Sequence, residues 1–311
     1  MFAGLSKDYG ITPIVRKISS DEGEGPKITH AFRYPSNRGI DIIVASTAGG
    51  NYMMDLFNST RGWATQPLFH ELTFWKPLSS KADDPAIDIV HETVNRLGDS
   101  LDYLALRETD CSIEQCTLRL VGQRDGKRVD EFIERKGEHA RYFAKGGAQP
   151  VLLDLYEQNP YVAPQSDSLK AEKLSLLARC MDIPESAASD TWCNEDQWRQ
   201  LTRLTPRPDS VNQLAHLYDE DRAGTINLFP AQGIGYNTKV PGRHAGEHFH
   251  EKDAFIGFWG TPVNATKRID TAVNGSLSPT IYQYLTGNTV VVGLDGWGFP
   301  SLLNQLTVEN P

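Results

Sequence analysis

The sequence predicts an α/β fold built around a mainly parallel sheet. Three short apolar runs carry this prediction, at residues 40–46, 225–229 and 254–259. The first run is almost continuously apolar, which is typical of a strand that is buried on both faces in a parallel sheet. The third run ends at a glycine and is too short for most helices, so a strand suits it better. We therefore expect the three runs to be neighbouring core strands of one sheet flanked by helices.

The first helix is expected after Asp84-Pro85, because proline is favoured at the first position of a helix. The residues that follow share one face at helical spacing: Ile87, Val90, His91, Val94 and Leu97. Asn95 occupies the position that a second histidine would have in a zinc-protease helix. We therefore expect His91 at the edge of the core and not on a metal ion.

Residues 102–144 have the patterns of strands. These patterns cover Tyr103–Leu106, Thr117–Val121 and Val129–Ile133. The sequence Arg-Asp-Gly-Lys at 124–127 lies between the second and the third of them. Because Asp-Gly is a typical two-residue hairpin turn, these two strands are expected to be antiparallel neighbours.

Helices are expected around 169–181, 195–204 and 210–218, and a short one from Ser278-Pro279 to Gly287. Strands followed by helices between about 100 and 205 predict an inserted or cap-like α+β subdomain. With 311 residues, of which 39% are hydrophobic, the chain is long enough to bury a sizeable core. The expected division is a sheet-core segment at 1–100, the inserted subdomain at 101–205, and a C-terminal core segment with a histidine-rich loop at 206–311.

Charge and hydropathy exclude two classes of partner. The net charge is −9, and the sequence contains no cluster of Lys and Arg. Nucleic acid is therefore not expected as the main partner. No run of about 18 apolar residues predicts a membrane span. Residues 1–9 lack the basic start and apolar core of a signal peptide.

The cysteines leave two alternatives open. Cys111 and Cys116 are five residues apart, and Cys180 and Cys193 are thirteen apart, so neither pair has the spacing of a zinc knuckle. Four cysteines permit two disulfides in an exported protein or four buried thiols in a cytosolic one.

The segment 242–253 places three histidines, His244, His248 and His250, within seven residues just before an apolar run. Neutral imidazole is the commonest protein ligand for zinc and similar ions, so metal chemistry is expected here first. Two other interpretations compete. The histidines could belong to a polar surface loop, or His248 and His250 could form half of a cupin metal motif, although Ala254 and Phe255 stand where that motif has its glutamate.

The surroundings of this loop resemble a known family. Asp221–Pro230 leads to Gly-x-His at 242–244, and Trp259-Gly260, the segment 274–280 and Gly287 follow in order. This order resembles the C-terminal part of the alkaline-phosphatase superfamily, in its type I phosphodiesterase and nucleotide-pyrophosphatase branch. The resemblance implies a three-layer sandwich, a metal-binding role for His244, and export from the cytoplasm.

The same resemblance predicts an incomplete metal centre. In the family, an Asp-His pair at the end of a buried strand binds a second metal ion. The matching strand here runs from Ile42 to Ser46, and Thr47 and Ala48 stand at the positions of that pair. Neither side chain supplies the carboxylate or imidazole that a tight divalent site requires. The chain is therefore expected to be a C-terminal part or a member with an incomplete two-metal site, with Thr47 and His244 facing one crevice.

The function that this resemblance implies is metal-dependent hydrolysis of a small-molecule phosphate ester, with a divalent ion such as zinc as the cofactor. The nucleophile is not among the recognisable residues, so the chain alone is expected to show little turnover. The alternative from another class is a non-catalytic α/β module that binds a ligand or partner. A cupin-like metal protein is a third alternative.

Overall fold

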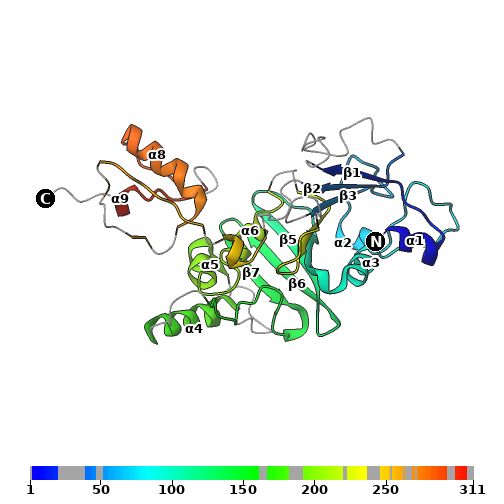
Figure 1. Ribbon diagram of the computed structural model, residues 1–311, viewed down its shortest axis with the longest axis horizontal. Coiled ribbons are helices and arrows are strands. Elements are labelled where there is room, and N and C mark those ends of the chain that lie inside the picture. The colour runs from blue at the N-terminus through cyan, green and yellow to red at the C-terminus, as the bar shows by residue number, and fades with distance from the viewer. Residues whose placement is uncertain are drawn as a thin grey trace. The chain divides into compact units, whose positions relative to one another are not determined.

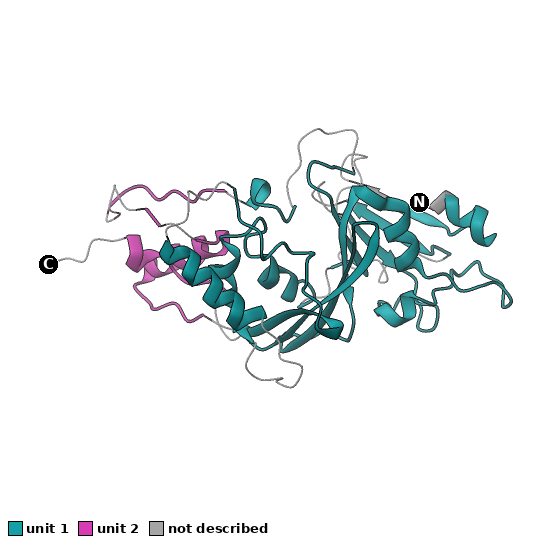
Figure 2. Cartoon of the chain, turned by 90° about the horizontal axis from the view of Figure 1, so that it is seen from below, with its two compact units in different colours: residues 1–252 teal, residues 253–311 magenta. Residues whose placement is uncertain are grey.

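The computed structural model describes residues 2–19, 39–46, 52–160, 167–181, 192–219, 223–236, 246–252, 254–261, 263, 268–269, 272–292 and 298–306. The chain divides into two compact units (Figure 2). Unit 1 comprises residues 1–252, and unit 2 comprises residues 253–311.

Unit 1 is built on one nine-stranded sheet with the order β1-β2-β3-β9-β4-β5-β6-β7-β8 (Figure 1). Its strands are β1 (Val15–Ser19), β2 (Ile42–Ser46), β3 (Tyr52–Leu56), β4 (Leu101–Arg107), β5 (Gln115–Arg124), β6 (Lys127–Lys136), β7 (His139–Ala144), β8 (Cys193–Asn194) and β9 (Ile226–Pro230). The sheet therefore combines strands from residues 15 to 230, and β9 returns late in the chain to lie between β3 and β4.

The α-helices are short apart from α4. In unit 1 they are α1 (Phe2–Tyr9), α2 (Phe69–Leu72), α3 (Ile89–Leu97), α4 (Asp167–Met181), α5 (Glu195–Thr202), α6 (Ser210–Ala215) and α7 (Phe249–Lys252). Unit 2 contains α8 (Leu277–Thr286) and α9 (Leu303–Leu306). Single 3-10 turns are η4 (Gly98–Ser100), η5 (Lys145–Gly147) and η6 (Asn274–Ser276). No helix in the described ranges is long and apolar enough to cross a bilayer.

The prediction of a three-layer sandwich with a mainly parallel sheet is wrong. Of the strand pairs that the structure describes, only β1 and β2 run parallel, and the others are antiparallel. Ile42 and Ile43 are successive residues of β2, so they point to opposite faces, and both are buried. A strand covered on both faces of a mixed sheet thus has the same apolar run as a parallel strand, and the run alone does not determine direction.

The three predicted core strands separate into two groups. Strands β2 and β9 belong to the same sheet, but β3 lies between them. Residues 254–259 form no strand and belong to unit 2. In this segment the Phe255 side chain is 93% exposed and Trp259 is fully exposed. Its apolar composition therefore does not reflect burial within its own unit.

The hairpin prediction is confirmed. Strands β5 and β6 pair in antiparallel register from Gln115↔Lys136 to Arg124↔Lys127. Asp125 and Gly126 form the turn with φ angles of 53° and 71°. Both lie in the left-handed region that a type I′ turn requires, and this is why Asp-Gly is favoured there.

The sheet has a hydrophobic cluster on each face. On β4, Tyr103 and Ala105 belong to the cluster that packs with α5 and α6, whereas Leu104 and Leu106 belong to the cluster that packs with α3. Because successive side chains of a strand alternate between faces, this one strand contributes to both cores. Strand β4 pairs directly with β9, so residues 101–107 continue the sheet that β2 and β3 begin. The predicted boundaries near 100 and 205 stay predictions.

The helix predictions hold with shifted ends. Helix α3 begins at Ile89, because Asp88 caps it by accepting a hydrogen bond from the amide of His91. Ile87, expected within this helix, instead forms a β-bridge with Trp75. His91 is exposed and not at the core edge. In unit 2, α8 ends at Gly287, which has a φ of 70° as a C-terminal glycine requires.

The cysteines form two disulfides, Cys111–Cys116 and Cys180–Cys193, and none is free. Of the two alternatives that the sequence left open, the structure has the first. Both bonds lie in unit 1, where they join the loop before β5 to β5, and the end of α4 to β8.

Candidate functional site

The candidate site is a cavity of about 630 Å³ in unit 1. It lies where β4 begins and β5 ends, and the loop after β7, the segment before α6 and the histidine-rich turn complete its walls. Its lining residues are Asp99, Leu101, Asp102, Gln123, Arg124, Asp154, Glu157, Gln158, Pro160, Pro206, Arg207, Ala231, Gln232, His248, Phe249 and His250. A space of this volume matches the usual size of a small-molecule site.

A buried ion cluster forms the floor of the cavity. Arg207 is only 8% exposed and pairs with Asp102 at 2.5 Å and with Asp154 at 2.7 Å. Arg124 binds the other oxygen of Asp102 at 2.9 Å. Asp102 therefore links two guanidinium groups, and Arg207 in turn links two carboxylates, so each of these two buried charges is paired twice.

Neighbouring carboxylates stabilise the protonated form of Arg207. Burial alone lowers the pKa of this guanidinium, but the carboxylates of Asp102 and Asp154 outweigh burial and raise the pKa above its ordinary value. Asp154 has a φ of 51°, in the left-handed region that residues with a side chain rarely adopt. This backbone conformation accompanies a carboxylate that is held against Arg207.

The histidine-rich turn is attached to the segment that carries Arg207. The amide of Phe249 donates to the carbonyl of Pro206 at 2.8 Å, and the Lys252 ammonium donates to the carbonyl of Pro208 at 2.9 Å. Lys252 also pairs with Glu247 at 2.6 Å. The turn is thus fixed by main-chain contacts and one ion pair, and it presents its imidazoles to the cavity.

His248 and His250 lie together on the cavity wall. Their rings are stacked, with centroids 5.4 Å apart and planes at 22°. Phe249 between them is buried and anchors the turn. Burial, Arg207 and His250, in that order, lower the pKa of His248 below its ordinary value. Its imidazole is therefore neutral at neutral pH, and its buried Nδ1 makes no hydrogen bond with the described residues.

Only some of the site residues predicted from the sequence line this cavity. His248 and His250, two of the three candidate metal ligands, share the cavity. His244, Thr47 and Ala48 lie outside the described residues, as does the expected approach of Thr47 to His244. The ligand set stays a prediction.

Sequence reasoning missed the charged floor. Asp102 is a single acid at the start of an apolar strand, and Arg207 stands between two prolines. A charged residue in such surroundings is a signal that it is held by partners, because unpaired charges are rarely buried. The identity of those partners, Asp154 and Arg124, could not be read from sequence spacing.

The described residues do not form a complete metal site. They contain no group of three or more His, Cys, Asp or Glu side chains placed to hold one ion. An open catalytic zinc site takes three protein ligands. The pair His248 and His250 supplies two imidazoles, which fits the chemistry of zinc but not its full coordination.

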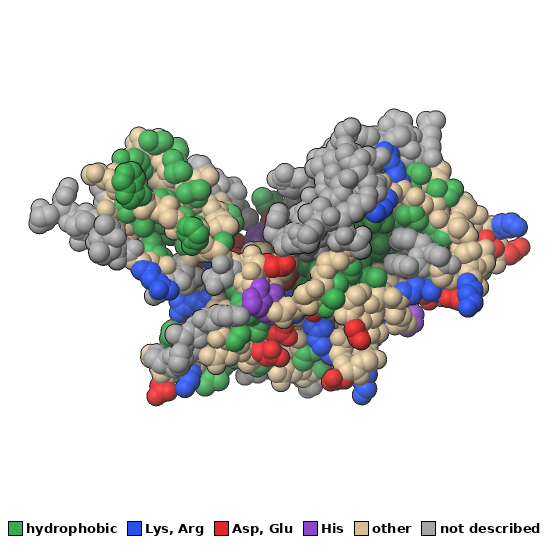
Figure 3. Space-filling model, in the orientation of Figure 1, with side chains coloured by type: hydrophobic (Ala, Val, Ile, Leu, Met, Phe, Trp, Pro, Cys, Tyr) green, Lys and Arg blue, Asp and Glu red, His purple; other side chains and the backbone are tan. Residues whose placement is uncertain are grey.

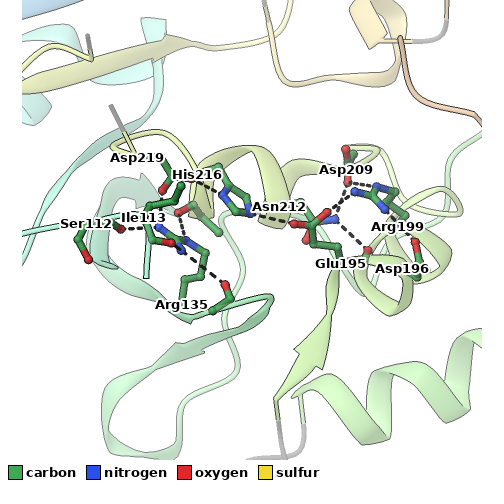
Figure 4. A network of polar contacts seen from close by, with 12 residues as sticks. Ser112, Ile113, Arg135, Glu195, Asp196, Arg199, Asp209, Asn212, His216 and Asp219 are labelled. Carbon is green, nitrogen blue, oxygen red and sulfur yellow. Dashed lines mark hydrogen bonds and ion pairs between the residues drawn. The ribbon is translucent and has the colours of Figure 1, made fainter. Parts of the chain in front are cut away.

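A second polar cluster in unit 1 surrounds His216 (Figure 4). His216 Nδ1 contacts Asp219 at 2.5 Å, and its Nε2 contacts Glu195 at 3.1 Å. Burial lowers the pKa of this imidazole, but both carboxylates outweigh burial and raise the pKa to about 9. Because both ring nitrogens are occupied, His216 is a charged structural group and not a metal ligand.

Arg135 extends this cluster to a disulfide loop. Its guanidinium pairs with Asp219 and donates to the carbonyl oxygens of Ser112 and Ile113, which lie between Cys111 and Cys116. Arg135 is fully buried, so its charge depends on these partners. Glu195 at the other end pairs with Arg199. The cluster therefore fixes the disulfide loop, α6 and α5 in one arrangement.

Comparisons of the chain with protein-family models, with curated proteins and with solved structures find no match.

Proposed function

We propose that this chain is a metal-dependent phosphoester hydrolase-like protein whose unit 1 cavity receives a small phosphate-containing ligand. The observation that carries this proposal is that His248 and His250 share one cavity with Arg207. Imidazoles suit a divalent ion, and guanidinium groups match the oxygens of a phosphate.

Zinc is the cofactor that these residues suit best. His248 and His250 would hold it, and His244 in the same stretch of sequence is the third donor that we propose. A bound zinc ion supplies charge that stabilises a transferring phosphoryl group. The chain's own residues would position the ligand: Arg124 lines the cavity with a guanidinium, and the buried Phe249 holds the turn that carries both imidazoles.

We expect little turnover from the chain as given. Thr47 and Ala48 cannot replace an Asp-His pair, so a second ion has no carboxylate or imidazole there. Both arginines are already paired with carboxylates, which weakens their attraction for a phosphate. Binding is therefore expected to exceed catalysis.

Zinc titration tests this proposal. The unmodified chain should bind one zinc ion weakly, and His244→Ala or His248→Ala should each reduce the affinity by at least about tenfold, because even the loss of a residue that only supports a ligand has an effect of that size. His91→Ala is the matched control, because His91 is exposed and does not line the cavity. Equal zinc affinity in all four proteins would contradict the assignment of the metal to this turn.

A phosphate ester distinguishes hydrolysis from binding alone. With zinc present, slow hydrolysis of an aryl phosphate diester that is lost in His244→Ala would support residual catalysis. Robust hydrolysis that His244→Ala leaves unchanged would contradict the proposed site. Binding without any turnover would favour the second candidate, a non-catalytic ligand-binding module. The described residues favour that candidate in one respect, because they hold no three-donor metal group.

A further inference from the structure

We infer that the unit 1 cavity selects phosphoesters whose alcohol part carries a positively charged amino group. This inference rests on the proposed function and deepens it by naming a substrate class. It starts from the balance of charges on the cavity lining and from the fact that only part of that charge is neutralised within the protein.

The lining carries more acidic than basic groups. Four carboxylates (Asp99, Asp102, Asp154 and Glu157) face two guanidinium groups (Arg124 and Arg207), so four minus two leaves an excess of two negative charges when the histidines are neutral. A ligand that brings positive charge is therefore favoured over one that is only anionic.

The excess charge belongs to two particular residues. The carboxylates of Asp102 and Asp154 are neutralised by ion pairs with Arg124 and Arg207. Asp99 and Glu157 are exposed, and their carboxylates form no hydrogen bond or ion pair within the part of the chain that the structure describes. The ammonium of Lys173, which does not line the cavity, donates to the main-chain carbonyl of Glu157 at 2.6 Å. It forms no hydrogen bond with the Glu157 carboxylate, although the charge of that carboxylate opposes the lowering of the Lys173 pKa by burial.

The arrangement of these carboxylates favours a molecular cation over a metal ion. A metal ion needs several donors converging on one point, and the described residues have no such group of three. An alkylammonium group needs only nearby negative charge and a surface for its methylene groups. Leu101, Pro206 and Phe249 supply apolar lining within the same cavity.

The arrangement assigns a role to each part of the cavity. In this inference the arginines and the imidazoles receive the phosphate, and Asp99 and Glu157 receive the amine. Because these two carboxylates are exposed, their attraction is screened by salt and amounts to a modest factor in affinity. They select among esters and do not create the binding site.

Paired ligands of equal shape test the inference. The full chain is titrated with 3-aminopropyl phosphate, 3-hydroxypropyl phosphate, inorganic phosphate and n-propylammonium at low ionic strength. The amino ester should bind about fivefold more tightly than the hydroxy ester, as expected for two exposed carboxylates. In the double variant Asp99→Asn, Glu157→Gln this preference should disappear. The control Asp83→Asn, Glu138→Gln, with two exposed acids that do not line the cavity, should keep it.

The outcomes separate this inference from the proposed function. Equal affinity for both esters in the unmodified chain overturns the inference and leaves phosphate binding in place. A preference that survives in the double variant overturns the role of Asp99 and Glu157. Binding of n-propylammonium that depends on both carboxylates, without binding of either ester or of phosphate, supports amine recognition and overturns the phosphoester function. Binding of none of the four probes overturns both.

Discussion

The two units differ in how they use apolar side chains. Unit 1 buries most of its large apolar residues in clusters on the two faces of its sheet. Among the residues that the structure describes in unit 2, the large aliphatic side chains that are buried are Leu302 and Leu306. Nine large apolar side chains of unit 2 are exposed: Phe255, Trp259, Leu277, Ile281, Tyr284, Leu285, Val291, Val292 and Phe299. Hydrophobic atoms cover much of the visible surface of this unit (Figure 3).

This difference shows that apolar composition and a hydrophobic core are separate properties. Burial of apolar surface stabilises a fold by roughly 25 cal/mol for each Å² removed from water. Unit 1 gains this stabilisation within itself, and the described part of unit 2 gains little of it. The stability of the chain should therefore respond to substitutions in unit 1 and be almost insensitive to matched substitutions in unit 2.

The largest expected effect is the difference between two tryptophan substitutions, one in each unit. Trp198 is fully buried in the core of unit 1, and its Nε1 donates to the carbonyl of Ala140 at 3.0 Å. Trp198→Ala should lower the free energy of unfolding by about 3–5 kcal/mol, because it leaves a cavity and an unpaired carbonyl. Trp259 is fully exposed, so Trp259→Ala should change the free energy by less than about 0.5 kcal/mol. Urea denaturation followed by circular dichroism measures both. Similar losses in the two variants would show that unit 2 buries Trp259.

An intermediate effect is expected from pH. His216 has an ordinary pKa of 6.5 that rises to about 9 in the folded chain, so folding favours the protonated form. Its contribution is complete below pH 6.5 and is lost as the pH rises through 9. A shift of this size corresponds to roughly 3 kcal/mol, which partial exposure reduces to about 2 kcal/mol. His216→Gln should flatten the decline in unfolding free energy between pH 6.5 and 9.

The unit comparison supplies a control for this pH effect. The described residues of unit 2 include no histidine, so a tryptophan probe at position 259 should report no change over the same range. If the decline with pH is the same in His216→Gln as in the unmodified chain, another group causes it.

The smallest effect concerns a hydroxyl group within the core of unit 1. Tyr103 is fully buried, and its ring stacks on Phe229 with centroids 4.7 Å apart. Its hydroxyl has no hydrogen-bond partner among the residues that the structure describes. A buried polar group without a partner destabilises the folded state by about 1–3 kcal/mol. Tyr103→Phe should therefore leave the free energy of unfolding unchanged or raise it by about 1 kcal/mol. A loss of more than 1 kcal/mol in calorimetry would show that a water or a ligand normally satisfies this hydroxyl.

The sequence predicted local structure better than strand direction. The Asp125-Gly126 hairpin and α3 follow from turn chemistry and helical periodicity, which are properties of neighbouring residues. The direction of β2 depends on which strands lie beside it, and no local pattern records that. The apolar composition of residues 254–259 predicts a buried strand, and this prediction is wrong. Composition alone does not show whether apolar residues are covered by other parts of the chain.

The candidate site could be predicted only where its residues are clustered in sequence. His248 and His250 are two residues apart and were found together in one cavity. Asp102 and Arg207 are paired in space but far apart in the chain, and Asp154 joins them through a third segment. Such a floor results from tertiary folding, so it could be recognised only once the fold was known.

The position of β9 has a consequence for the order in which the chain folds during synthesis. Strands β4 to β7 follow each other closely, so this meander can pair as soon as its residues leave the ribosome. Strands β1 to β3 have no direct partner in that meander, because β9 separates β3 from β4. The two halves of the sheet therefore join only after residues 226–230 have been made. Until then both β3 and β4 expose a strand edge, and this interval is when the nascent chain most needs protection from aggregation.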